Sequence, residues 1–426
     1  MNTIVLHYLY ILGGIMKKSK LVVASMLGAL AAATILMSGC NGGGGEEPQS
    51  QGYIDLNVRP DGEKAGNTET GEGGEGGGTT ENPADDDVVT AEEEASEFPK
   101  GLTEADCYRS ELTNLWTDKK LQNQRPVAIM VDNERTAYDH YGLNSADIIY
   151  ELMNSTANDR VTRLMCIVKD WENLQQFGSI RSTRPTNVIL AGEYNAILVH
   201  DGGPFYINKY LARSYSNNLS GGFARFKNGK AYEFTEYVTS KDTNGSDGLV
   251  DRIAQAGYST TYNSYYPGLH FNFNSSITDL SSNHSGSVTG KDIYLPHPHN
   301  KSELHYNEQT HKYEYKCYGM AHIDPLDNNK VLSFENVILQ CTGWSLCRYD
   351  DGTPDPNGYM IYDVVNSDTG YYFTEGRCIN IRWKKTSETD LTHYYDAETG
   401  EELRLNTGKT YISLIPNDNW SKLKFN

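Results

Sequence analysis

The run Pro126-Val-Ala-Ile-Met-Val131 leads directly into Asp132-Asn133, and it is the stretch that sets the fold class. Three further apolar runs follow at 146–150, 161–168 and 196–199, and polar residues follow each of them. Short apolar runs that end at turn signals are typical of buried β-strands. These runs therefore predict a set of buried strands in the first half of the folded chain.

Helix signals lie beside these strands. Pro185 follows Arg184 and opens the segment 185–193, where proline suits the first position of a helix. We also predict helices over 205–213 and 249–256, and a short helix over 103–116 that begins with a capping-box pattern. Strands that alternate with helices indicate an α/β domain, which we place at residues 101–275.

The character of the chain changes after a polar linker at 276–290. The later segments read as strands and hairpin turns, namely strands at 336–340, 378–383 and 410–415 and turns at 306–313 and 395–400. Residues 291–426 are therefore expected to form a mostly β domain. The predicted fold class is α+β, with an N-terminal α/β domain followed by a mostly β C-terminal domain behind a disordered tether.

The first 40 residues carry a targeting signal. Met16-Lys17-Lys18 opens a basic region, an apolar run follows, and Leu36-Met-Ser-Gly-Cys40 closes it. This layout predicts a signal peptide over 1–39, with Met16 as the better start, rather than a transmembrane helix. Lipid on Cys40 would then anchor the chain at the extracytoplasmic face of the cell membrane.

Residues 40–100 read as a disordered tether. The segment 41–100 is rich in glycine and holds 16 acidic residues against three basic ones, so it buries too little apolar surface to fold. The remainder of the chain is only moderately acidic. Such an acidic chain argues against nucleic acid as a partner, while local basic pockets remain open.

The cysteines and histidines are candidates for disulfide bonds and for metal ligands. Removing Cys40 leaves Cys107, Cys166, Cys317, Cys341, Cys347 and Cys378. An exported chain permits disulfides, and the Cys341–Cys347 spacing could close a loop, but the pairing stays open. His297, His299, His305, His311 and His322 lack the spacing of metal ligands, so we expect no metal and no cofactor.

Two arginines form the sharpest candidate site. Arg181 and Arg184 directly precede the predicted helix at 185–193, where backbone N–H groups are free, and Arg163 is a weaker third member. Guanidinium groups in such a place can hold a carboxylate or phosphate. The alternative is internal pairing of these arginines with Glu151, Asp132 or Asp147.

A second candidate is His200-Asp201-Gly202-Gly203, which follows a predicted strand. Strand ends line the ligand crevice in open α/β sheets, and glycine lets the backbone approach a ligand closely. We expect Asn133, Gly202 and Gly203 to contact a ligand, and His200 to act as a donor or a general base. The alternative is a tight turn with a hydrogen-bonded histidine.

Several of these motifs together resemble a known family. Residues 125–133, 146–151, 178–184 and 200–203, with 373–376, 381–385 and 405–412 later in the chain, are similar to the YerB-type lipoproteins of Gram-positive bacteria. The resemblance spans about 120–420. It implies a lipid-anchored envelope protein of two domains, and it carries over no established activity.

Three hypotheses for function follow. The first is a non-catalytic protein that binds an anionic cell-wall component, a peptide stem or a wall-synthesis protein through Arg181 and Arg184. The second is a wall-active hydrolase or transferase that uses His200 with Glu151 or Asp132. The third is a scaffold that binds an envelope protein through its β domain.

Overall fold

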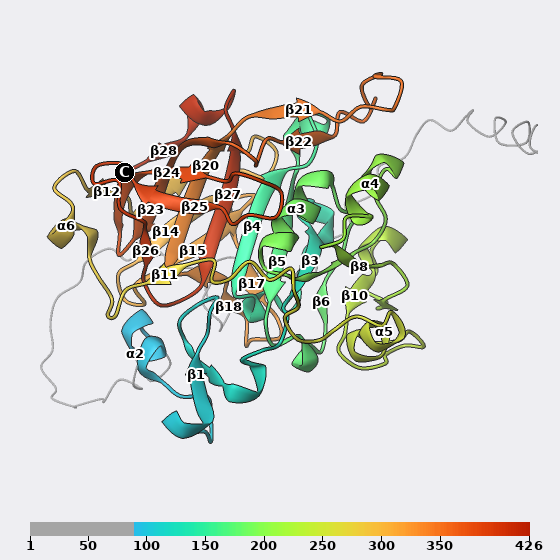
Figure 1. Ribbon diagram of the computed structural model, residues 1–426, viewed down its shortest axis with the longest axis horizontal. Coiled ribbons are helices and arrows are strands. Elements are labelled where there is room, and N and C mark those ends of the chain that lie inside the picture. The colour runs from blue at the N-terminus through green and yellow to red at the C-terminus, as the bar shows by residue number, and fades with distance from the viewer. Residues whose placement is uncertain (1–88) are drawn as a thin grey trace, which may run out of the picture. The chain divides into compact units, whose positions relative to one another are not determined.

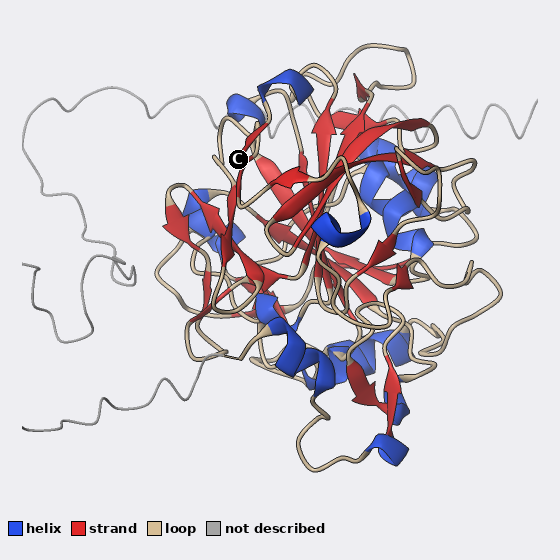
Figure 2. Ribbon diagram, turned by 90° about the vertical axis from the view of Figure 1, so that its left-hand side faces the viewer, coloured by secondary structure: helices blue, strands red, loops and turns tan. Residues whose placement is uncertain are grey.

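A computed structural model describes residues 89–426, so the predicted signal peptide, the lipidation site at Cys40 and most of the predicted tether lie outside the described residues. The described chain is mostly strand, with short helices around a strand-rich centre (Figure 2). The predicted fold class is confirmed. None of the helices in this part of the chain is both long and apolar enough to cross a membrane.

The centre is an 11-stranded sheet (Figure 1). In spatial order its strands are β12 (Val288–Thr289), β24 (Arg377–Lys384), β23 (Ser367–Thr374), β20 (Asn336–Thr342), β27 (Thr410–Pro416), β4 (Ile148–Met153), β5 (Thr162–Val168), β3 (Val127–Asp132), β7 (Ile197–His200) and β8 (Asn217–Ser220), and β25 (His393–Asp396) pairs with β24. All four apolar runs at 126–131, 146–150, 161–168 and 196–199 are strands of this sheet, as predicted.

One pairing joins the two halves of the chain. Strand β4 from the first half pairs in parallel with β27 from the second, with Thr410 opposite Ile148 and Leu414 opposite Leu152. The sheet therefore runs without a break from one predicted domain into the other. Short-range sequence patterns contain no information on this long-range pairing.

The strand directions place the ends of many strands at one edge of the sheet. Strands β20, β27, β4, β3, β7 and β8 all point the same way, and β5 alone between them runs in the opposite direction. The carboxyl ends of the six strands therefore share an edge with the start of β5. Asp132, Arg163 and His200 lie at this edge.

Both faces of the sheet are covered, which explains the continuous apolar runs. Along β3, Val127, Ile129 and Val131 face one core, whereas Ala128 and Met130 face the other. Helix α3 (Pro185–Glu193) packs on the second face with Val188 to Ala191. Proline stands at its first position, as predicted.

A six-stranded sheet covers the other face. It contains β16 (Met320–Ala321), β15 (Lys312–Cys317), β14 (Glu303–Asn307), β13 (Asp292–Tyr294), β28 (Lys424–Phe425) and β19 (Ser333–Phe334). Its residues Ile293, Leu304, Tyr313 and Tyr315 enter the first core. The predicted hairpin at 306–313 is the turn between β14 and β15.

Small strands complete the fold. They are β1 (Cys107–Arg109) with β2 (Trp116–Asp118), β6 (Phe177–Gly178), β9 (Ala224–Arg225) and β10 (Glu236–Val238) in a small sheet, β11 (Asn272–Phe273) with β26 (Arg404–Leu405), β17 (Ile323–Asp324) with β18 (Lys330–Val331), and β21 (Trp344–Leu346) with β22 (Met360–Tyr362). The remaining helices are α2 (Ala91–Ser96), α4 (Asn208–Leu211), α5 (Leu249–Gln255) and α6 (Leu280–Asn283).

Three helix predictions met different outcomes. The helix at 249–256 is confirmed as α5. The helix at 205–213 is interrupted, because a 3-10 turn at Phe205–Ile207 precedes the short α4. The helix at 103–116 is wrong: Thr103 and Asp106 make the predicted capping bonds, but only one 3-10 turn follows before β1 pairs with β2.

The predicted tether extends too far. Residues 91–96 form α2, which Thr90 caps, and its Ala91 is buried and donates its N–H to the Thr310 carbonyl at 2.9 Å. Glu94 of the acidic run pairs with Lys312. The acidic run predicts disorder, but its residues lie in the first turn of α2, where negative charge stabilises a helix. This helix packs against the β-rich half.

The linker at 276–290 also holds structure, since α6 and β12 lie within it. The proposed Cys341–Cys347 bridge is absent, because both thiols are free and buried. The other four cysteines after residue 88 are free and buried as well. Burial raises the pKa of the Cys341 thiol to about 12, so this thiol is a poor nucleophile.

Candidate anion-binding site

Two arginines converge at the shared strand edge. Arg163 lies at the start of β5 and Arg184 lies immediately before α3, and both direct Nη1 toward Ser182. The Arg163 Nη1 donates to the Ser182 carbonyl at 2.8 Å and to its Oγ at 3.0 Å. The Arg184 Nη1 donates to the same Oγ at 3.1 Å. Two guanidinium groups therefore lie within hydrogen-bond reach of one hydroxyl.

The positive charge of this pair is only partly offset, because Asp132 lies opposite Arg163 in the β3–β5 register and raises its pKa but forms its ion pair with Arg181. In the part of the chain that the structure describes, neither Arg163 nor Arg184 forms an ion pair with an acidic side chain, although other arginines do. The Nε atom of each is buried and has no hydrogen-bond partner. Burial and the neighbouring Arg184 lower the pKa of Arg163 to about 9, and burial also lowers the pKa of Arg184. Both remain cations at neutral pH.

The second half of the chain covers this pair. The β21–β22 hairpin reaches across to α3 and the end of β4 (Figure 1), where Tyr359 pairs with Ser155. The Tyr359 ring stacks on the Arg184 guanidinium at 3.8 Å. The Tyr362 N–H donates to Thr186 Oγ1 at 3.0 Å. The site is therefore built from both halves of the chain.

Sequence reasoning missed Tyr359 and Asn154, whose Oδ1 accepts a bond of 3.3 Å from Arg163 Nη1. Tyr359 stands in a polar loop far along the chain, and only the packing of the hairpin on β4 brings it to Arg184. No local sequence pattern therefore marks Tyr359 as a contact of Arg184.

Arg181 has a different environment from Arg184. Its Nε donates to Asp132 Oδ2 at 2.8 Å, and its Nη2 pairs with Glu233. Internal pairing, the alternative weighed above, thus applies to Arg181 and Asp132. The backbone of Arg181 still shapes the site, because its carbonyl accepts the Asp201 N–H at 3.0 Å and so holds two loops together.

The segment 200–203 lies beside Arg184, as expected from the strand order. The Gly202 carbonyl accepts the Thr183 N–H at 3.2 Å. The His200 side chain, however, is only 1% exposed, and its Nδ1 lies 2.8 Å from the same carbonyl. Burial lowers its pKa, and Nε2 faces Asn218 Oδ1 at 3.3 Å. Both ring nitrogens of His200 are thus engaged within the protein.

Gly202 and Gly203 differ in how closely other atoms pack around them. Gly203 has φ +158°, and a Cβ there would lie 2.3 Å from Ile207 Cδ1 and 3.2 Å from the Thr183 carbonyl. Gly202 has φ +71° with open space around its Cα. Gly203 is therefore needed for close packing of the loop beside Thr183.

Glu151 and Asn133 point away from this edge into the core. Glu151 is fully buried, and its two oxygens accept bonds from Thr162 (2.6 Å), Ser302 (2.7 Å), Asn133 (3.2 Å), Tyr315 (2.9 Å) and Tyr411. His200 is not among these donors. His200 therefore makes no hydrogen bond to Glu151 or to Asp132, the two alternative partners of the hydrolase hypothesis.

The histidine-rich segment shows separate partners. His305 contacts Asp292 and Glu303, and His297 contacts Ser413. Within residues 89–426, the structure holds no group of three or more His, Cys, Asp or Glu side chains that could bind a metal ion.

Comparison with known proteins places the chain in a family. Residues 112–259 match the N-terminal domain, and residues 293–412 the C-terminal domain, of a family described as "protein of unknown function (DUF3048)". The chain belongs to this two-domain family, so the resemblance noted from the sequence is confirmed.

A curated relative and a solved structure agree with this assignment. The chain is 24% identical over 311 residues to a Bacillus subtilis protein named "putative lipoprotein YerB", covering 72% of this chain and 86% of the relative. The crystal structure of the Bacillus subtilis YerB protein superposes with a TM-score of 0.58 at 21% identity, covering 73% of this chain and 98% of the other. This likeness shows a shared fold and gives no activity.

Proposed function

We propose that the chain is an envelope protein, anchored through lipid on Cys40 at the extracytoplasmic face of the membrane, that binds an anionic cell-wall component through Arg163 and Arg184. The observation that carries this proposal is the arginine pair, Arg184 buried and Arg163 partly exposed, without an ion-pair partner in the described chain. The name of the relative supports the lipid anchor.

The arginine pair suits a phosphate or a carboxylate. Removing guanidinium groups from water costs free energy unless a negative charge or several acceptors compensate. Here Ser182, Thr183 and Asn154 supply neutral oxygens only. A bound anion would supply the missing charge and would accept bonds from the free N–H groups.

The three arginines divide into two roles. Arg163 and Arg184 hold the anion, whereas Arg181 is a positioning residue that Asp132 and Glu233 fix. Gly202 and Gly203 shape the neighbouring loop. This assignment revises the sequence hypothesis, which ranked Arg181 above Arg163.

The proposal is tested by ligand-dependent thermal unfolding of the full chain carrying Cys40→Ser, which removes the lipidation site. The probes are inorganic phosphate, a glycerol phosphate oligomer and a muropeptide. A ligand at about 100 times its Kd should stabilise the protein by about 2.7 kcal/mol. We expect Arg163→Gln and Arg184→Gln to abolish this shift.

The matched control is Arg382→Gln, an exposed arginine on β24 without an ion-pair partner in the described chain. It should retain the full shift. Because Arg184 is buried and its loss could disturb folding, the partly exposed Arg163 provides the decisive variant. An equal shift in Arg163→Gln and in the wild type would refute the proposal.

A further inference from the structure

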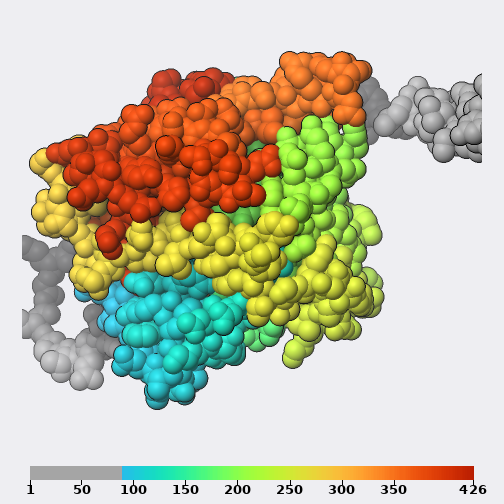
Figure 3. All heavy atoms as spheres, in the orientation of Figure 1, coloured from blue at the N-terminus to red at the C-terminus, as the bar shows by residue number. Residues whose placement is uncertain are grey.

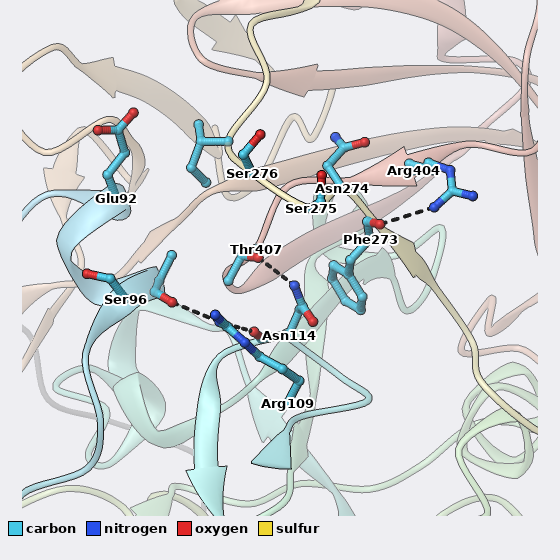
Figure 4. Close-up of a pocket in the computed structure, with 12 residues that line it drawn as sticks. Glu92, Ser96, Arg109, Asn114, Phe273, Asn274, Ser275, Ser276, Arg404 and Thr407 are labelled. Atoms are coloured by element: carbon cyan, nitrogen blue, oxygen red, sulfur yellow. Dashed lines mark hydrogen bonds between the residues drawn. The ribbon is translucent and has the colours of Figure 1, made fainter. Parts of the chain in front are cut away.

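A polar cavity of about 860 Å³ lies away from the arginine pair (Figure 4). Three separate segments line it, namely the region of α2 and β1, the loop at 273–277 after β11, and the turn at 404–407. The corresponding blue-to-cyan, yellow and red regions of the chain adjoin on one face of the molecule (Figure 3). The volume is within the range of small-molecule sites, which is about 300–1,000 Å³.

The lining is rich in neutral hydrogen-bonding groups. They come from Ser96, Asn114, Asn274, Ser275, Ser276 and Thr407, and Phe273 adds one aromatic ring. The Asn114 Nδ2 donates to Thr407 Oγ1 at 2.7 Å, which ties the first segment to the third. Hydroxyl and amide groups around an aromatic ring suit a ligand that carries many hydroxyls and has apolar C–H faces.

Two arginines give the cavity a positive charge. The Arg109 Nη1 donates to the carbonyls of Ala95 (2.8 Å) and Asn114 (2.9 Å), and its guanidinium stacks on Trp116 at 4.1 Å. The Arg404 Nη1 donates to the Phe273 carbonyl at 3.3 Å. These contacts hold the Arg109 guanidinium in place, whereas the exposed Arg404 makes only its one long bond.

The remaining guanidinium N–H groups have no acidic partner. Over residues 89–426, neither Arg109 nor Arg404 forms an ion pair, and Glu92 is the single acidic residue of the lining. Unpaired guanidinium groups beside hydroxyl and amide groups favour an anion attached to a polyhydroxyl body.

We propose that this cavity binds a short oligosaccharide that carries a carboxylate. Asn114, Asn274 and Thr407 contact the sugar hydroxyls, Phe273 packs against a sugar face, and Arg404 holds the carboxylate. The site is separate from Arg163 and Arg184, and it does not depend on the anion site proposed above.

The test uses isothermal titration and side-chain amide NMR signals of Asn114 and Asn274 in the full chain carrying Cys40→Ser. The probes are N-acetylglucosaminyl-N-acetylmuramic acid, which has a carboxylate, and its neutral counterpart diacetylchitobiose. We expect the acidic disaccharide to bind about tenfold more tightly and to shift both amide signals. Acetate alone should shift neither signal.

Arg404→Gln is the main variant, because Arg404 is exposed and makes one long hydrogen bond. It should weaken the acidic disaccharide about tenfold and leave the neutral one unchanged, whereas Arg382→Gln should change neither. Arg163→Gln should retain sugar binding, which separates this site from the first one. Equal affinity for both disaccharides, unmoved amide signals, or an Arg404→Gln variant that binds like the wild type would overturn the proposal.

Discussion

The Tyr315 hydroxyl donates a hydrogen bond of 2.9 Å to Glu151 Oε2, and the two residues belong to different halves of the chain. Glu151 lies on β4, and Tyr315 lies on β15 in the sheet that covers the first core. Ser302 and Tyr411 of the second half donate to the same carboxylate. A single buried carboxylate thus connects both family domains.

Glu151→Gln should destabilise the protein. The substitution keeps the volume but removes the charge that five donors share, and hydrogen bonds to a charged group contribute about 1.5–3 kcal/mol each. We expect the free energy of unfolding in denaturant to fall by about 2–4 kcal/mol. Glu172→Gln, at an exposed position, is the control and should change it little. An unchanged midpoint for Glu151→Gln would contradict this structural role.

The first half of the chain should not fold alone. Residues 89–290 would expose the edge of β4 that β27 covers, and would leave Glu151 without three of its donors. We expect this fragment to lack cooperative thermal unfolding by circular dichroism. Co-expression with residues 291–426 should restore it. A fragment that melts cooperatively alone would show that the two halves are independent.

His140 and His322 should stay neutral well below their usual pKa. Both are buried, and His140 Nδ1 lies 2.9 Å from His322 Nε2. Burial lowers the pKa of His322 to about 4, and burial together with the nearby His322 and Lys230 lowers the pKa of His140 well below its usual value.

The lowered pKa values of these two histidines make the folded protein less stable at acidic pH. Above pH 6.5 the two histidines are neutral in both the folded and the unfolded state. Below pH 6.5 they take up protons in the unfolded chain but not in the folded chain. This contribution to stability is therefore lost as pH falls from about 6.5 toward 4, by up to about 2.7 kcal/mol per pH unit for two histidines. The NMR signals of His140 and His322 in the folded protein should not titrate above pH 5. A titration of either ring near pH 6.5 would contradict this prediction.

Gly203→Ala should disturb the loop beside Arg184. The new Cβ would lie too close to Ile207 and the Thr183 carbonyl, at a backbone φ of +158°. We expect a loss of about 2–3 kcal/mol in unfolding free energy. Gly202→Ala meets open space and should cost about 1 kcal/mol through its φ of +71° alone. Equal losses for both variants would refute the packing argument.

Local patterns predicted the elements of this fold well, and long-range geometry explains what they missed. The strands at 126–131 and 161–168 and the proline-started helix at 185–193 follow from apolar runs and turn residues. The parallel pairing of β4 with β27 depends on contacts across most of the chain, which no local pattern encodes.

The candidate site shows the same division. Sequence reasoning selected Arg163, Arg181 and Arg184, because their positions at a strand start and before a helix can be read locally. It could not distinguish Arg181, which Asp132 neutralises, from Arg184, which stacks on Tyr359. The sequence also suggests Glu151 as a catalytic carboxylate. Only the structure shows that Tyr315 and Tyr411 from the other half bury it and bind its oxygens.

The central claim is that Arg163 and Arg184 bind an anion. Its most direct measurement is the NMR signal of each Nε–H group, assigned with Arg163→Gln and Arg184→Gln, during titration of the full chain carrying Cys40→Ser with inorganic phosphate. Both Nε atoms are buried and unpartnered in the structure. If both arginines bind phosphate, these two signals shift together and saturate, while the Arg181 signal moves little. Unchanged Arg163 and Arg184 signals at saturating phosphate would contradict it.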